Sequence, residues 1–139
     1  MNLKRNLGQQ VEQALKAAGA QNSPAIIRQS GKPEYGHYQA NGIMGAAKKL
    51  GKNPRELAQQ TLKTLVDNIG DSATFEIAGP GFINVTFSRK FITDCLTEMA
   101  NDKRLGVFAQ SRQKVVVDYS SPNLAKEMHI GHLRSTAIG

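Results

Sequence analysis

The sequence predicts an α+β protein: a small antiparallel sheet with helices on one face, followed by the start of a second, parallel domain. Three features carry this prediction. Several segments place apolar residues at helical spacing, two alternating segments flank a tight turn, and an apolar β-branched run stands near the C-terminus. Helices combined with an antiparallel hairpin favour a layer of helices over a sheet. We place the boundary near residue 110, so that residues 1–110 form the first domain and residues 111–139 begin the second.

The predicted helices of the first domain are recognised by their apolar stripes and by the residues at their ends. Gly19 ends the first helix and Gly51 ends the second. The third has the clearest start, because Asn53 can cap it and Pro54 suits the first helical position. Ser88 can cap the fourth. The stripes consist of Leu3, Leu7, Val11, Ala14, Leu15 and Ala18; of Ile43, Met44, Ala47 and Leu50; of Leu57, Ala58, Thr61, Leu62, Leu65 and Val66; and of Phe91, Ile92, Cys95, Leu96 and Met99.

Strands are predicted at 25–29, 74–78 and 82–87, and Gly79-Pro80-Gly81 forms the turn between the last two. In the last strand, Ile83, Val85 and Phe87 share the face toward the core, whereas Phe82, Asn84 and Thr86 share the open face. The segment 37–41 is polar and aromatic, and His37 in it is interpreted as a surface residue.

On the open face, Phe82 stands beside Asn84. Proteins that read single-stranded RNA stack a base on such a ring and bond the edge of the base with such an amide. The alternative is an ordinary exposed Phe next to a turn.

The C-terminal stretch combines the elements of an anion site. The run Val115–Val117 is typical of a strand buried on both faces. A polar turn follows at 118–123, and His129 to His132 begin a predicted helix. We therefore expect Lys114–Tyr119 to be the first strand of a parallel nucleotide-binding (Rossmann-like) domain, truncated after part of one helix. Free N–H groups and the positive end of the dipole favour a phosphate at such a helix start.

His129 and His132 could both donate hydrogen bonds to phosphate oxygens, and Gly131 leaves room for a flat base to press against the backbone. The alternative is one surface histidine and one core histidine. The preceding strand, the turn and Lys126 favour phosphate binding. A zinc site is excluded because no third ligand lies at suitable spacing, and no metal site is predicted.

Composition indicates a reduced, cytoplasmic protein with a polyanionic partner. The only cysteine, Cys95, excludes an internal disulfide. No apolar run suits a membrane helix or a signal peptide, so no membrane association is expected. The net charge is +7 and the pI is near 9.8, which fits attraction to phosphates; a basic protein without such a partner is the alternative.

The last 25 residues, VVVDYSSPNLAKEMHIGHLRSTAIG, closely resemble the ATP-binding signature of class I aminoacyl-tRNA synthetases, and within them the arginyl enzymes. His129-Ile130-Gly131-His132 matches the class motif letter for letter. The run from Asp118 through Asn123, Lys126-Glu127-Met128 and Leu133–Thr136 point to arginine. From about Glu34, the upstream sequence resembles the additional N-terminal domain of the bacterial arginyl enzymes, although an Asp is more usual where His37 stands.

The resemblance implies an arginine–tRNA ligase. In that reaction the carboxylate of arginine attacks the α-phosphate of ATP, pyrophosphate leaves, and arginine passes to the terminal ribose of its tRNA. The implied ATP-binding and catalytic residues are Lys126, His129, Gly131 and His132; the arginine-binding residues are Ser121, Pro122, Asn123 and His132; and the residues that hold the tRNA near its D-loop are Phe82 and Asn84. Mg²⁺ is expected to accompany ATP, without dedicated ligands in this chain.

Two other functions stay open. A nucleotidylyltransferase shares the strand, turn and His-x-Gly-His arrangement, but Ser-Ser-Pro-Asn and the large preceding domain argue against it. A free-standing RNA-binding module with a vestigial C-terminal tail is the non-enzymatic alternative. We expect the 139-residue chain to be an N-terminal fragment that has no synthetase activity alone.

Overall fold

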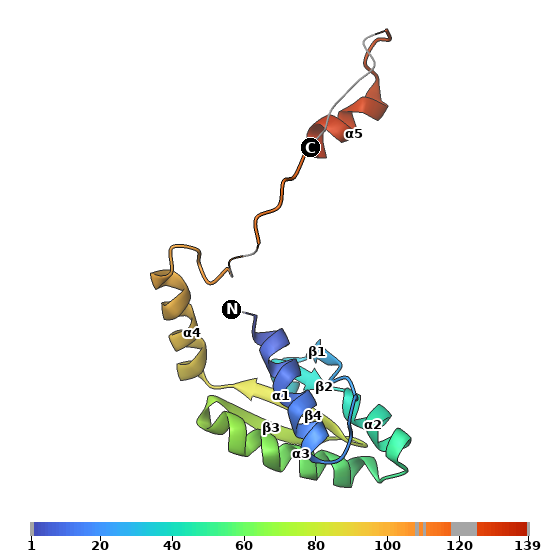
Figure 1. Cartoon of the computed structure of the whole chain (residues 1–139), viewed down its shortest axis with the longest axis vertical. Coiled ribbons are helices and arrows are strands. Elements are labelled where there is room, and N and C mark those ends of the chain that lie inside the picture. Colours follow the sequence, from blue (N-terminus) through green and yellow to red (C-terminus); the bar gives the residue numbers. More distant parts are fainter. Residues whose placement is uncertain (1, 108, 110, 118–124, 139) are drawn as a thin grey trace. The chain divides into compact units, whose positions relative to one another are not determined.

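The computed structural model describes residues 2–107, 109, 111–117 and 125–138. The chain separates into two compact units, Met1–Phe108 and Ala109–Gly139 (Figure 1). The first unit contains a sheet, its covering helices and an apolar core. In the second unit, one helix is present among the described residues.

The first unit is built around an antiparallel sheet, as the sequence predicts. Its described strands follow the order β1-β2-β4-β3, with every neighbouring pair antiparallel. The strands are β1 (Ile27–Gln29), β2 (Tyr38–Ala40), β3 (Ala73–Ala78) and β4 (Phe82–Phe87). The helices are α1 (Leu3–Ala17), α2 (Gly42–Leu50), α3 (Pro54–Ile69) and α4 (Arg89–Asn101), with short 3-10 turns η1 (Pro33–Tyr35) and η2 (Gly70–Ser72). Helices α1 and α3 pack on each other and on the sheet (Figure 1).

The core lies between one face of the sheet and these helices. Ile83 and Val85 of β4 are fully buried, and they stand opposite Ile77 and Phe75 of β3. From the helices come the fully buried side chains of Val11, Leu15, Leu57 and Leu65. Burial of one such side chain contributes about 1.5–3 kcal/mol to folding. The predicted inward face of β4 is therefore confirmed.

The predicted helix ends are also present. The side chain of Asn53 accepts a hydrogen bond from the backbone N–H of Arg55 at 2.9 Å, and Ser88 accepts from Phe91 at 3.2 Å. Each bond satisfies one of the backbone donors that a helix start leaves without an intrahelical partner. Gly51 closes α2 in the left-handed conformation, with φ of 62°.

Strand β2 was not expected from the sequence. Its three residues, Tyr38–Ala40, pair with β1 on one side and with β4 on the other. A strand this short shows no clear alternation, so pairing with distant strands rather than local pattern defines it. The strand predicted at 25–29 begins only at Ile27, because Ile26 has a positive φ of 48° that breaks the extended backbone.

In the second unit the helix prediction is confirmed, whereas the described part of the strand predicted at 114–119, residues 114–117, lies in no strand. Helix α5 spans Ile130–Ile138. The run Val115–Val117, expected as a buried strand, lies in no strand, and its side chains are 72, 85 and 73% exposed. A parallel strand needs neighbours on both sides to bond its backbone and cover its faces, and the described sheet holds only β1 to β4.

Within the described ranges, no helix has the length and apolar character needed to cross a bilayer.

Candidate functional site

The imidazoles of the two histidines of the second unit both accept backbone hydrogen bonds at the start of α5. His129 precedes the first residue of the helix, and its Nδ1 accepts from the backbone N–H of Gly131 at 3.1 Å. His132 lies one turn further on, and its Nδ1 accepts from the backbone N–H of His129 at 3.1 Å. The bond to His132 is that of a capping box, in which the third helical residue binds the N–H of the residue before the helix; the ring of His129 differs in binding the second helical N–H instead of the third. Here imidazoles replace the usual hydroxyl and carboxylate.

These bonds fix the tautomer of both rings. A ring nitrogen that accepts a hydrogen bond carries no proton, so the proton of each neutral imidazole lies on Nε2. Both rings therefore offer an Nε2–H donor, and their centroids are 4.1 Å apart. Two adjacent donors that are held by the backbone suit the oxygens of one phosphate chain.

Gly131 permits this arrangement. A Cβ atom at this position would stand 2.9 Å from Cε1 and 3.0 Å from Nδ1 of His129. The imidazole of His129 thus lies over the backbone where a larger residue would place its side chain. From the sequence, an adenine is expected to take this space; in the structure the imidazole of His129 lies there.

Of the other site residues predicted near the C-terminus, only Lys126 is among the described residues. Lys126 lies in a bend three residues before His129 and is exposed; in the described part of the chain, no hydrogen bond or ion pair joins its ammonium to either imidazole. Ser121, Pro122 and Asn123 lie outside the described residues. Among the residues that are described, no three His, Cys, Asp or Glu side chains gather as metal ligands would.

The predicted RNA-contacting residues lie on the sheet face that α1 and α3 leave open. Phe82 begins β4 and is half-buried, with its ring 3.7 Å from the point where a Cβ of Gly79 would stand. Asn84 stands in the middle of the same strand and is only 4% exposed. The ring is therefore available for stacking, whereas the amide is largely enclosed.

Asn84 is enclosed by a polar row across the sheet. Gln39 of β2 and Glu76 of β3 are its direct neighbours in register. The Nε2 of Gln39 donates to Oδ1 of Asn84 at 2.8 Å, so the carbonyl oxygen of Asn84 is occupied and its amino group is the remaining donor. Sequence reasoning missed Gln39, because without β2 nothing in the pattern indicates that residues 39 and 84 meet.

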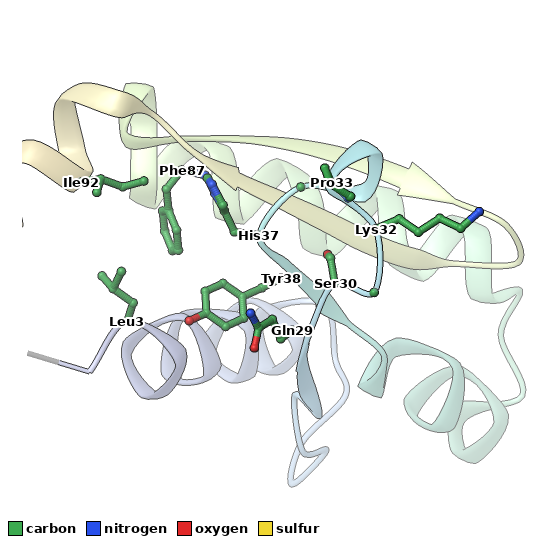
Figure 2. A pocket seen from close by; sticks show the side chains of 11 residues that line it. Leu3, Gln29, Ser30, Lys32, Pro33, His37, Tyr38, Phe87 and Ile92 are labelled. Carbon is green, nitrogen blue, oxygen red and sulfur yellow. The ribbon is translucent and has the colours of Figure 1, made fainter.

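At the far end of β4, a pocket of about 430 Å³ lies among the side chains of Leu3, Tyr38, Phe87 and Ile92 (Figure 2). His37 lines it and is exposed, as expected of a surface residue. Its Nδ1 nevertheless accepts from the backbone N–H of Phe87 at 3.0 Å, and the two rings stack at 6.2 Å. His37 thus supplies an acceptor to the end of β4.

The protein families that the chain matches show which class of protein it is. Residues 94–139 match the family described as tRNA synthetases class I (R), catalytic domain. Residues 5–87 match the arginyl tRNA synthetase N terminal domain. The chain belongs to the arginyl-tRNA synthetase family.

Whole proteins and solved structures that are similar to the chain are named arginine–tRNA ligase or arginyl-tRNA synthetase. The chain is 56% identical over its entire length to an arginine–tRNA ligase of Vibrio parahaemolyticus and 54% identical to one of Aliivibrio fischeri, and it covers 24% of each. The arginyl-tRNA synthetase of Plasmodium falciparum matches 98% of this chain at 26% identity with a TM-score of 0.79, over 26% of its own length. The Thermus thermophilus arginyl-tRNA synthetase matches 99% at 28% identity and a TM-score of 0.67, over 22% of its length. The chain therefore spans about a quarter of the relatives it matches.

Proposed function

We propose that this chain is the N-terminal part of an enzyme that attaches arginine to its tRNA at the expense of ATP. The observation that carries the proposal is the pair of Nε2–H donors that the capping bonds of His129 and His132 hold at the start of α5. Activation of a carboxylate on the α-phosphate of ATP builds charge on phosphate oxygens, so the enzyme needs fixed donors more than a nucleophile.

In this proposal, each ATP-site residue has a separate role. His129 and His132 donate to phosphate oxygens. Lys126 supplies a positive charge to the α-phosphate, and Gly131 leaves room over the backbone for the imidazole of His129. Mg²⁺ enters with ATP, because a nucleoside triphosphate is commonly bound with this ion through its own phosphates.

The arginine site would be formed by Ser121, Pro122 and Asn123 together with His132. Their polar groups would bind the ammonium and carboxylate of the amino acid, and His132 would thus stand between the two substrates. We place the reaction in the cytoplasm, where it would serve translation.

Residues 1–110 would hold the tRNA near its D-loop, and residues 111–139 would begin the catalytic domain. Phe82 would stack an unpaired base. Because Gln39 already donates to the carbonyl oxygen of Asn84, the amino group of Asn84 would be its main contact to the base and would donate to an acceptor on the base edge.

The test is tRNA charging by the full-length protein with each amino acid in turn. Charging with arginine alone supports the proposal. Transfer of AMP to a small acceptor without charging would instead indicate a nucleotidylyltransferase. RNA binding without ATP turnover would indicate a binding module.

A further inference from the structure

The link between α2 and α3 is strongly basic. Between Lys48 and Arg55 the sequence reads KKLGKNPR, with four cations and no carboxylate. These four side chains are exposed. With any described residue, none of them forms an ion pair, whereas Lys32 and Lys90 are paired with Glu34 and Asp94. We call Lys48, Lys49, Lys52 and Arg55 the basic junction.

Helix stability explains only part of the basic junction. Lys48 and Lys49 lie in the last turn of α2, where the dipole favours cations. The ammonium of Lys52 lies 3.4 Å from the carbonyl oxygen of Ala18, which follows α1. Arg55 lies in the first turn of α3, where the dipole disfavours a cation. Helix stability therefore does not account for all four positions.

The fold brings the end of the basic junction to the turn that precedes Phe82. The β3–β4 turn packs against the start of α3 so closely that a Cβ on Gly81 would stand 2.9 Å from the carbonyl oxygen of Pro54 (Figure 1). Phe82 follows directly, and its ring lies against Gly79 in the same turn. Phe82 and the start of α3, which carries Arg55, thus lie at the same end of the sheet, and the three lysines lie in the segment that leads into α3.

A base that stacks on Phe82 brings its own strand with it, and the phosphates next to that base must pass this end of the sheet. Phosphate contacts fix the position of a nucleic acid and supply most of the salt-dependent affinity, while base contacts supply the specificity. We propose that the basic junction binds the RNA phosphates that flank the base on Phe82. This inference rests on the proposed function of residues 1–110.

The test compares two variants of the 139-residue chain with equal charge. The first carries Lys48→Gln, Lys49→Gln, Lys52→Gln and Arg55→Gln. The matched control carries Lys4→Gln, Arg5→Gln, Lys63→Gln and Arg89→Gln, which are exposed residues outside the junction. Affinity for transcribed arginine tRNA is measured from 50 to 300 mM salt, with circular dichroism to confirm folding.

Each phosphate contact to single-stranded nucleic acid contributes about 0.7 to the slope of log K against log salt, so loss of three or four contacts lowers the slope by about 2 to 3. We expect this loss in the junction variant and a much smaller change in the control. Equal losses in both variants, or no loss in the junction variant, would overturn the inference.

A Phe82→Ala arm separates this inference from the proposal beneath it. Binding that depends on the junction but not on Phe82 would refute the base contact and leave a sequence-blind phosphate surface. Binding that depends on Phe82 but not on the junction would refute the inference alone. A wild-type chain that binds no tRNA would refute both.

Discussion

Substitutions of His129 and His132 can separate the stabilisation of α5 from the binding of phosphate. Asp is among the preferred residues before a helix, and Glu is a standard third residue of a capping box. His129→Asp and His132→Glu should therefore keep the bonds to the backbone N–H groups of Gly131 and His129. An ionised carboxylate has no hydrogen-bond donor, so each replacement should lose one contact to ATP.

The expected changes in stability and in activity follow from the loss of one cap or of one donor. A cap contributes about 0.5–2 kcal/mol, so His129→Ala and His132→Ala should destabilise α5 by that amount, whereas the Asp and Glu variants should not. Removal of one fixed donor to a developing charge costs about 10²–10³ in kcat. All four variants should therefore lose this factor in activity, while only the two Ala variants also lose stability.

The assay is arginine-dependent exchange of pyrophosphate into ATP by the full-length protein, with thermal unfolding of each variant as control. His129→Asp or His132→Glu with wild-type exchange would refute the assignment of Nε2–H as the phosphate donor. Loss of stability in the Asp and Glu variants equal to that of the Ala variants would refute the capping geometry.

Further predictions concern the first unit. His37→Ala leaves the N–H of Phe87 without its acceptor and should lower the free energy of unfolding by about 1–2 kcal/mol in urea titrations, whereas His37→Asp, which keeps an acceptor, should lower it less; equal losses would contradict the role of this bond. Gly81→Ala places a Cβ against the carbonyl of Pro54 at φ of 139° and should cost about 1–3 kcal/mol; an unchanged urea midpoint would show that the turn is free to move. Burial, with help from nearby carboxylates, raises the pKa of the Cys95 thiol above 9.0. The unfolded chain therefore loses this proton first, so the thiol's contribution to stability is complete below pH 9.0 and disappears as the pH rises through the folded-state pKa. The free energy of unfolding of Cys95→Ala should therefore depend less on pH than that of the wild type between pH 8 and 10. Parallel plots of unfolding free energy against pH for the two proteins would contradict this.

Features set by local sequence could be predicted, and features set by distant pairing could not. The start of α3 follows from Asn53 and Pro54, because a cap and a first-turn proline act within one turn. Strand β2 escaped prediction, because its three residues are held only by strands that are remote in the sequence. Val115–Val117 has the composition of a buried strand, but composition alone cannot supply the neighbouring strands that bury it.

The candidate sites divide in the same way. The spacing of His129 and His132 at a helix start contained a signal for the capping box, since it joins the residue before the helix to the third helical residue. The bond from Gln39 to Asn84 had no such signal, because it depends on the register between β2 and β4. Its consequence, an enclosed amide with one free donor group, becomes visible only in the folded sheet.

The most direct test of the central claim is charging of tRNA by the full-length protein, measured separately with each amino acid. The account predicts ATP-dependent charging with arginine alone, and strong loss of that activity in His132→Glu without loss of folding. Charging with another amino acid, or no charging by a folded protein supplied with ATP, Mg²⁺ and tRNA, would contradict it.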